Sequence, residues 1–186
     1  AVPTAGSAAK VTLTLSDLQG RTPTGNVTLK FNGKSYVSPV VSGVATFNTP
    51  VQTAGAKSYT YTYVTDSQIA GFTQTGTVTV EKSAVTSVVG AVTKAPTAAA
   101  AGKFTITVTR DVTLPKVGGT VKVTLTKGNV TKVINAPVAN GVANVALPKL
   151  ESGAWTVSYQ YLGDATFAAG SVISFTNGIT VASIRR

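Results

Sequence analysis

The sequence predicts an all-β protein made of two β-sandwich domains in tandem. Three observations lead to this prediction. β-Branched residues outnumber the straight-chain residues that favour helices, apolar and polar residues alternate in many short stretches, and the chain repeats itself once. Hydrophobic residues make up 43% of the 186 residues and charged residues 12%, so the chain can form packed cores.

The repeat appears when the chain is aligned with itself. Pro3-Thr4-Ala5 recurs as Pro96-Thr97-Ala98, at an offset of 93, and SGVATFNTP (42–50) matches NGVANVALP (140–148), at an offset of 98. The second offset also relates three residues at the end of a strand, Tyr61, Tyr63 and Asp66, to Tyr159, Tyr161 and Asp164. The offset grows only in turn regions, where insertions are tolerated. We therefore expect two homologous domains, residues 1–82 and 83–186.

Within each unit, short alternating stretches separated by turn residues predict strands with one apolar face. In the first unit the expected inward-facing residues are, in order, Val11, Leu13 and Leu15; Val27, Leu29 and Phe31; Tyr59, Tyr61 and Tyr63; and Val78 and Val80. In the second unit they are Phe104, Ile106 and Val108; Val121, Val123 and Leu125; Trp155, Val157, Tyr159 and Tyr161; and Ile173 and Phe175. Thr, Ser and Lys fill most of the alternate positions, as expected of faces in contact with water.

Asn and Gly pairs mark the tight turns. Asn32-Gly33, Gly128-Asn129 and Asn140-Gly141 lie between alternating stretches. These residues accept the positive φ angles that two-residue hairpin turns require. The sequence therefore predicts hairpins at these places.

The two units differ at their beginnings. The stretch TSVVGAVT (86–93) precedes Pro96 and can supply a first strand for the second unit, whereas two residues precede Pro3. We expect the first unit to lack its first strand within this chain. Since an open sheet edge invites pairing, residues near 10–15 or 73–80 are expected to border a partner or an upstream segment.

The hairpin SGVATF and the segment GAWTVSYQYLGDATFAAG (153–170) resemble the bacterial immunoglobulin-like repeats, whose units carry a Gly-Val-Ala hairpin and a Tyr-x-Gly-Asp-x-x-Phe strand end. The second unit has this pattern at Tyr161, Gly163, Asp164 and Phe167, whereas the first has Thr65 and Ile69 in place of the Gly and the Phe. The resemblance implies two immunoglobulin-like sandwiches used as stalk, spacer or adhesive modules in bacterial surface proteins and phage virions. It implies no chemistry, because a fold does not determine a function.

Catalysis is not expected from the inventory of reactive side chains. The chain has no His and no Cys, which removes the commonest general base, the Ser-His-Asp arrangement and thiolate metal sites. The six carboxylates are widely spaced: Asp17, Asp66, Glu81, Asp111, Glu151 and Asp164. We expect no catalytic residue, no cofactor and no metal. No apolar run has the length of about 18 residues that a membrane-spanning segment needs.

Asp66 and Asp164 follow Tyr-x-Tyr strand ends at equivalent places in the two units, which favours a structural role. A short carboxylate there can accept hydrogen bonds from the backbone of its own turn. The expected structural turn motif consists of Tyr63, Asp66, Tyr161, Gly163, Asp164 and Phe167.

The net charge of +10 is uneven, because residues 1–83 carry +3 and residues 84–186 carry +7. Four lysines on or beside one expected hairpin form a candidate basic docking patch: Lys116, Lys122, Lys127 and Lys132. Such a patch fits an acidic protein or an anionic glycan, and the alternative is a solvated edge protected by lysines. Nucleic-acid binding is not expected, since the aromatic residues occupy core-facing positions.

Two functional hypotheses follow. In the first, the chain is a phage virion component, such as a capsid decoration or tail protein, that docks on a protein shell and contacts host-surface glycans. In the second, it is a repeat segment of a bacterial cell-surface or secreted adhesin. The first ten residues lack the basic and apolar segments of a signal peptide, so the chain is expected to be either a whole protein made in the cytosol or a piece of a longer one.

Overall fold

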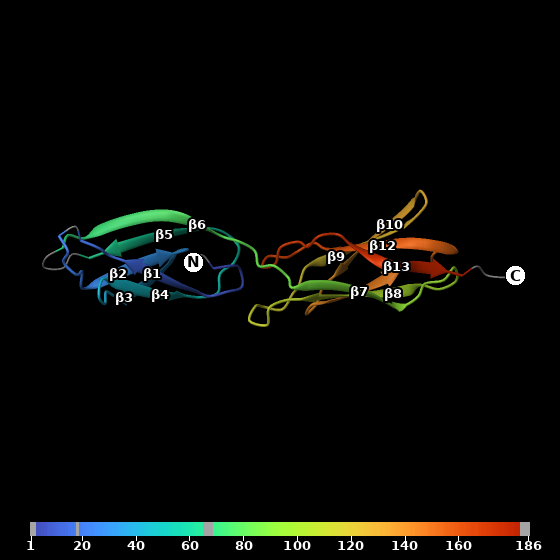
Figure 1. Ribbon diagram of the computed structural model, residues 1–186, viewed down its shortest axis with the longest axis horizontal. Helices are drawn as coiled ribbons and strands as arrows, with labels where there is room; N and C mark the ends of the chain where they lie inside the picture. Colours follow the sequence, from blue (N-terminus) through green and yellow to red (C-terminus); the bar gives the residue numbers. More distant parts are fainter. Residues whose placement is uncertain (1–2, 18, 65–68, 183–186) are drawn as a thin grey trace. The chain divides into compact units, whose positions relative to one another are not determined.

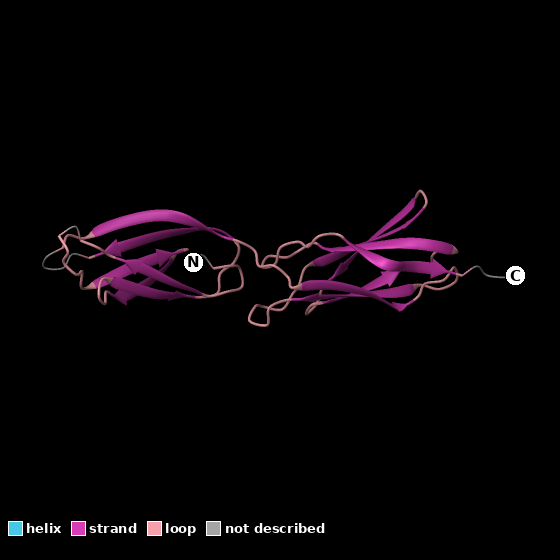
Figure 2. Ribbon diagram, viewed as in Figure 1, coloured by secondary structure: helices cyan, strands magenta, loops and turns pink. Residues whose placement is uncertain are grey.

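The computed structural model describes residues 3–17, 19–64 and 69–182. Its described residues form strands, turns and loops and no helix, as Figure 2 shows, so the expected all-β class is confirmed. No helix in this part of the chain could therefore cross a membrane. The chain divides into two compact units, Ala1–Lys82 and Ser83–Arg186.

The first unit is a sandwich of a four-stranded and a two-stranded antiparallel sheet (Figure 1). The larger sheet has the order β3-β2-β5-β6, from β2 (Asn26–Phe31), β3 (Lys34–Pro39), β5 (Gly55–Tyr63) and β6 (Phe72–Val80). The smaller sheet pairs β1 (Ala9–Thr14) with β4 (Val44–Thr49). Side chains between the sheets form the core, including Val27, Leu29, Phe31, Phe47 and Tyr63.

The second unit has the same plan with one strand more. Its larger sheet has the order β10-β9-β12-β13, from β9 (Thr120–Lys127), β10 (Val130–Pro137), β12 (Gly153–Tyr161) and β13 (Ile173–Val181). Its smaller sheet has the order β11-β8-β7, from β7 (Ser87–Lys94), β8 (Gly102–Thr109) and β11 (Val142–Leu147). Trp155, Phe104, Tyr161 and Phe167 are among its largest buried side chains.

The expected inward faces lie in the cores, but they are not equally buried. In the second unit, Phe104, Ile106 and Val108 are at most 3% exposed. In the first unit, Val11 and Leu13 pack against the core and remain partly exposed. Ile173 and Phe175 in β13, an edge strand, are also partly exposed.

The expected turns are confirmed by their backbone angles. Asn32 and Gly33 have φ values of 47° and 81°, and Asn140 and Gly141 have values of 51° and 83°. Both pairs therefore adopt the left-handed conformation that a two-residue hairpin needs. Gly128 has a φ of 54° and connects β9 to β10.

The first strand of the second unit lies where the sequence predicts it. Residues 87–94 form β7, which pairs antiparallel with β8, so β8 has a neighbour on each side. Among the described residues of the first unit, β1 has one strand neighbour, β4. The smaller sheet of the first unit thus ends where that of the second unit has β7.

Candidate functional site

The carboxylate of Asp164 is bound by the backbone of two turns. Its Oδ1 accepts hydrogen bonds from the N–H groups of Thr166 and Phe167, each at 2.7 Å. Its Oδ2 accepts a hydrogen bond from the N–H of Gly118, at 3.1 Å, in the loop that leads to β9. The Asp164 N–H donates to the carbonyl oxygen of Phe167 at 3.0 Å and closes the turn. The carboxylate therefore joins its own turn to a loop that is distant in sequence.

Tyr161 and Gly163 complete this structure. The Tyr161 side chain is fully buried, and its hydroxyl donates to the carbonyl oxygen of Gly118 at 3.0 Å. Burial, and then the negative charge of Asp164, raise the pKa of the Tyr161 hydroxyl. Gly163 has a φ of 83°, and a Cβ there would lie 2.8 Å from the Phe167 carbonyl oxygen, so a side chain would collide with the turn.

The first unit contains the equivalent tyrosine contact. Tyr63 is 1% exposed, and its hydroxyl donates to the carbonyl oxygen of Thr24 at 2.8 Å. Asp66 and Thr65 lie outside the described residues. Ile69, at the place of Phe167, packs against the edge of the core and is partly buried.

Two further aspartates bind their own turns, a feature that the repeat does not predict because neither of them belongs to the repeated strand end. The Asp17 carboxylate accepts a hydrogen bond from the Arg21 guanidinium at 2.8 Å, and this contact holds the pKa of Asp17 below its ordinary value. The Asp111 carboxylate accepts hydrogen bonds from the N–H and hydroxyl of Thr113, which lower the pKa of Asp111. Within the described residues, no three carboxylates are grouped as a metal ion would require.

The structure distributes the four lysines of the candidate patch over different surfaces. Lys122 pairs with Asn135 of β10 and Gln160 of β12 on the outer face of the larger sheet, since its neighbours Val121 and Val123 are buried. Lys132 lies opposite Leu125, which is buried. Because residues directly opposite in an antiparallel pair share a face, Lys132 is on the other face of the hairpin from Lys122.

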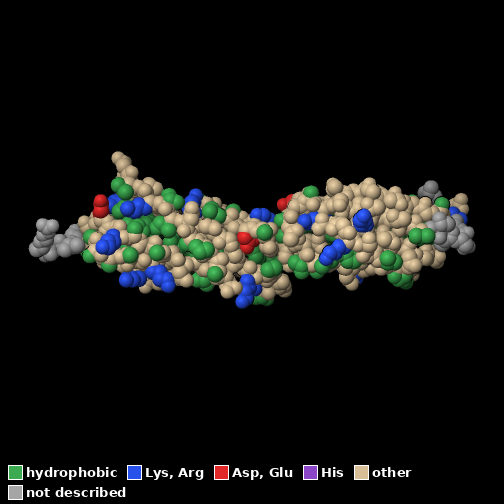
Figure 3. Space-filling model, turned by 180° about the vertical axis from the view of Figure 1, so that it is seen from behind, with side chains coloured by type: hydrophobic (Ala, Val, Ile, Leu, Met, Phe, Trp, Pro, Cys, Tyr) green, Lys and Arg blue, Asp and Glu red, His purple; other side chains and the backbone are tan. Residues whose placement is uncertain are grey.

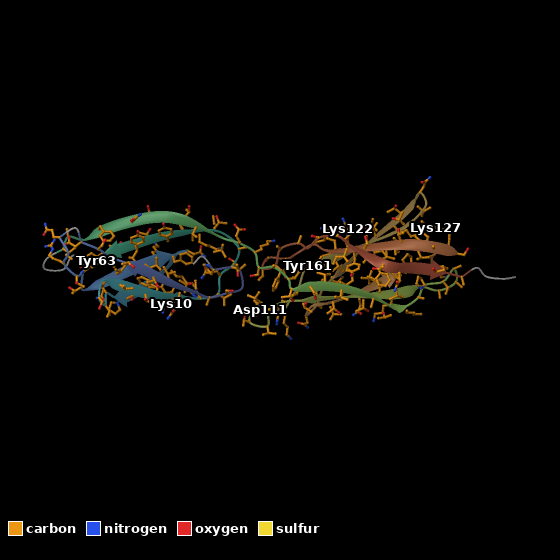
Figure 4. All side chains as sticks on the ribbon, viewed as in Figure 1. Lys10, Tyr63, Asp111, Lys122, Lys127 and Tyr161 are labelled. Atoms are coloured by element: carbon orange, nitrogen blue, oxygen red, sulfur yellow. The ribbon has the colours of Figure 1, made fainter. Side chains whose placement is uncertain are left out.

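Lys127 is on the same face as Lys132, and it is occupied by local contacts. Its ammonium donates to the carbonyl oxygen of Ser152 at 2.5 Å, lies 3.5 Å from the Glu151 carboxylate and sits 5.9 Å from the centre of the Trp155 ring. Figure 4 shows Lys122 and Lys127 along the larger sheet of the second unit. Lys116 is exposed and lies in the loop between β8 and β9. Lys122, Lys127 and Lys132 therefore do not share one face.

On the face that Figure 3 shows, the positive charge is dispersed. In Figure 3, Lys and Arg side chains are spaced over the visible face of each unit, with few Asp or Glu side chains between them. On that face the charge is spread over each unit rather than concentrated at one site.

The surface of the first unit contains an apolar hollow. An apolar groove of about 370 Å³ opens between β1 and the inner face of the larger sheet. The residues that line it include Val11, Leu13, Leu29, Phe47, Tyr59 and Tyr61. The sequence predicts the open edge but not the groove. A sequence signal for the groove is the smaller residue Val11 in the first unit, at the position where the second unit has Phe104.

Comparison with solved structures identifies the fold. Invasin, a bacterial integrin-binding protein, matches with a TM-score of 0.54 and 20% identity over 94% of this chain and 37% of the invasin chain. The D0–D1 domain of intimin matches with a TM-score of 0.29 and 20% identity, over 94% of this chain and 93% of that one. The FN1–FN3 domains of chicken CNTN1 match with a TM-score of 0.33 and 9% identity, over 97% of this chain and 65% of that one.

The invasin match, which has the highest TM-score of the three, confirms the expectation of tandem immunoglobulin-like sandwiches. This chain spans about a third of the length of the invasin chain that it matches. No family model matches the chain, and no curated protein sequence matches it.

Proposed function

We propose that this chain is a non-enzymatic attachment protein, built of two immunoglobulin-like domains (1–82 and 83–186) and displayed on a bacterial surface. The observation that carries the proposal is that three of the six carboxylates, Asp17, Asp111 and Asp164, are bound to groups of nearby turns or loops. Broad strand faces rich in Thr, Ser and Lys are left to meet a partner. The similarity of the fold to that of invasin supports this assignment.

Binding through such faces is expected to be weak for a single domain and strong when many copies bind at once. Strand faces of this kind are broad rather than pocketed, so single contacts are expected to be transient. Display of many copies converts weak contacts into avidity, which can exceed the affinity of one copy by about a hundredfold or more. The partners that fit are a surface protein, or glycans that carry negative charge.

In this proposal Lys122, Lys132 and Lys116 attract an anionic partner through their summed charge and not as one patch, since Lys122 and Lys132 lie on opposite faces of the hairpin. Lys116 and Lys132 are exposed, and Lys122 is partly exposed on the outer face of the larger sheet. Lys127 is excluded from this role because Ser152 and Glu151 bind its ammonium. Attraction by surface charges of this type decreases with ionic strength.

The charge of the second unit favours a second candidate, a phage virion component. Residues 84–186 carry +7. A domain of this charge fits a decoration or tail protein that docks through its second unit on an acidic protein shell and displays the first unit to the host. The two candidates differ in what the second unit contacts: host receptor or assembly partner.

A bead assay tests the proposal. Beads that carry many copies of the chain are expected to adhere to intact host cells, and adhesion should fall after protease or glycosidase treatment of those cells. Lys122→Glu with Lys132→Glu should reduce adhesion at low salt, whereas Lys30→Glu with Lys34→Glu in the first unit is the matched control. Adhesion that is equal for coated and bare beads would overturn the attachment function. Binding to purified phage shells but not to cells would select the virion candidate.

A further inference from the structure

The groove of the first unit lies where the second unit has a strand. In the second unit, β7 pairs with β8, and Val88 and Val92 of β7 pack against the core. The equivalent of β8 in the first unit is β1, whose corresponding side is open among the described residues. The groove of about 370 Å³ occupies this side and is lined mainly by apolar groups.

The burial of equivalent residues shows what that strand does. Phe104 and Ile106 of β8 are fully buried, whereas Val11 and Leu13, at the same places in β1, are partly exposed. Burial of such side chains is a main source of stability in a small domain. The core of the first unit is therefore incomplete on the side where β7 completes the second.

Two tyrosines show the same difference. Tyr159 of β12 is 6% exposed, and its hydroxyl oxygen accepts a hydrogen bond from the N–H of Gly90 in β7 at 3.0 Å. Tyr61 has the equivalent place in β5, lines the groove and is partly exposed. Its hydroxyl donates to Gln74 Oε1 at 2.6 Å, which leaves the oxygen able to accept a bond from an incoming N–H.

The lysine on the edge strand β1, Lys10, does not exclude pairing. A lysine on an edge strand often blocks the approach of another strand. Lys10 of β1 has Lys103 as its equivalent, and Lys103 belongs to a strand with neighbours on both sides. A lysine at this position is thus compatible with a paired edge.

We propose that this groove is an acceptor for an extended strand from a partner polypeptide, which adds antiparallel to β1 in the register that β7 keeps with β8. Val92 and Val88 lie opposite Phe104 and Val108, so the incoming strand places small apolar residues opposite Val11 and Leu15. Strand addition of this kind combines backbone hydrogen bonds with side chains that fill pockets at alternate positions.

The central residue of the incoming strand need not be glycine. Gly90 is required in β7 because a Cβ there would lie 2.5 Å from the Phe104 ring and 2.9 Å from the Tyr159 ring. Val11 takes the place of Phe104 in the first unit and leaves room at this point. The groove therefore favours a partner with the pattern apolar-x-apolar-x-apolar, and a valine at the centre should improve binding over a glycine.

Synthetic peptides test the proposal with the full chain. The probes are a peptide of residues 84–95, the same peptide with valine at the position of Gly90, and a control in which serine replaces both Val88 and Val92. Amide exchange read by nuclear magnetic resonance should show protection of residues 10–15 by the first two peptides and none by the control. The valine peptide should bind more tightly than the glycine peptide, by about tenfold for one buried side chain.

Two chain variants locate the binding. Val11→Glu introduces a charge into the groove and should abolish protection, while Thr14→Glu places the same charge on an exposed position of β1 outside the groove and should not. Since the chain has no cysteine, Leu13→Cys provides a milder variant for disulfide trapping. A peptide with cysteine at the position of Gly90 should form the disulfide, and one with cysteine at the neighbouring position of Ala91 should not.

Three results would overturn the proposal. The first is absence of protection at residues 10–15 together with absence of a register-specific disulfide. The second is equal binding by the serine control peptide. The third is protection of the same amides by self-association of the chain without peptide, because a second copy would then be the occupant. Each of these leaves the attachment function of the displayed faces to be decided by the bead assay.

Discussion

Asp164 and Gly118 lie 46 residues apart in the sequence and are joined by a hydrogen bond of 3.1 Å from the glycine N–H to the aspartate carboxylate. The same glycine accepts a hydrogen bond from the Tyr161 hydroxyl through its carbonyl oxygen. Both backbone groups of Gly118, its N–H and its carbonyl, are thus bound by side chains at and just after the end of β12. Four predictions follow from this arrangement and from the neighbouring core.

Asp164→Ala should destabilise the second unit by about 2 kcal/mol, because three backbone N–H groups lose a charged acceptor. Urea unfolding followed by the fluorescence of Trp155, the one tryptophan of the chain, reports on this unit. Asp111→Ala is the control, since its carboxylate binds an exposed turn, and its effect should be smaller. Equal effects of the two substitutions would contradict a bracing role for Asp164.

Tyr161→Phe should cost about 1 kcal/mol near neutral pH, the value of one buried hydrogen bond. In the folded chain the pKa of Tyr161 is raised, so the unfolded chain loses this proton first, above about pH 10. The stability that the raised pKa reflects is therefore complete below about pH 10 and is lost as the pH rises further. Phenylalanine does not ionise, so the variant does not lose this stability. The difference in the free energy of unfolding between the parent and the variant should therefore shrink at alkaline pH, as measured by urea unfolding. An unchanged difference would show that Tyr161 does not titrate differently in the two states.

Gly90→Ala should destabilise the second unit by about 1 to 3 kcal/mol, because the new methyl group would overlap the Phe104 and Tyr159 rings. The neighbouring Ala91 is exposed, so Ala91→Val serves as a matched control on the same strand and should be close to neutral. Trp155 fluorescence during urea unfolding compares the two variants. A neutral Gly90→Ala would mean that β7 can move away from the core.

Lys127→Met should lower stability by less than about 1 kcal/mol, the usual value of a partly exposed ion pair, and should leave adhesion unchanged. The methionine keeps an unbranched apolar side chain at this position and removes the bonds to Ser152 and Glu151 and the charge near the Trp155 ring. Lys132→Met should have the opposite profile, with unchanged stability and reduced adhesion at low salt. Loss of adhesion in Lys127→Met alone would assign the docking role to Lys127.

Much of the fold can be read from local patterns. Alternation of apolar and polar residues has a period of two only in a strand, so the positions of Val121, Val123 and Leu125 reveal an inward face without any tertiary information. The turn at Asn140-Gly141 is equally local, since few residues accept positive φ. Because the chain repeats, the same strand and turn patterns occur in both units, which strengthens each prediction.

The arrangement of the candidate lysine patch could not be predicted from local sequence patterns. Four lysines on or beside one hairpin look like a patch, but the pairing register separates Lys122 from Lys132, and Lys127 contacts Ser152 and Trp155. Which contacts a long side chain makes depends on strands that are distant in sequence, and no local period encodes them.

By itself the sequence determined that this protein is an all-β tandem repeat and where many of its strands and turns lie, because those features depend on periodicity and on residues that accept special backbone angles. Tertiary structure alone decided which side chains from different strands meet. The hydrogen bond from Gly118 to Asp164 and the groove beside Val11 both arise where segments far apart in the chain are brought together. The volume of the groove also depends on the sizes of side chains from several strands.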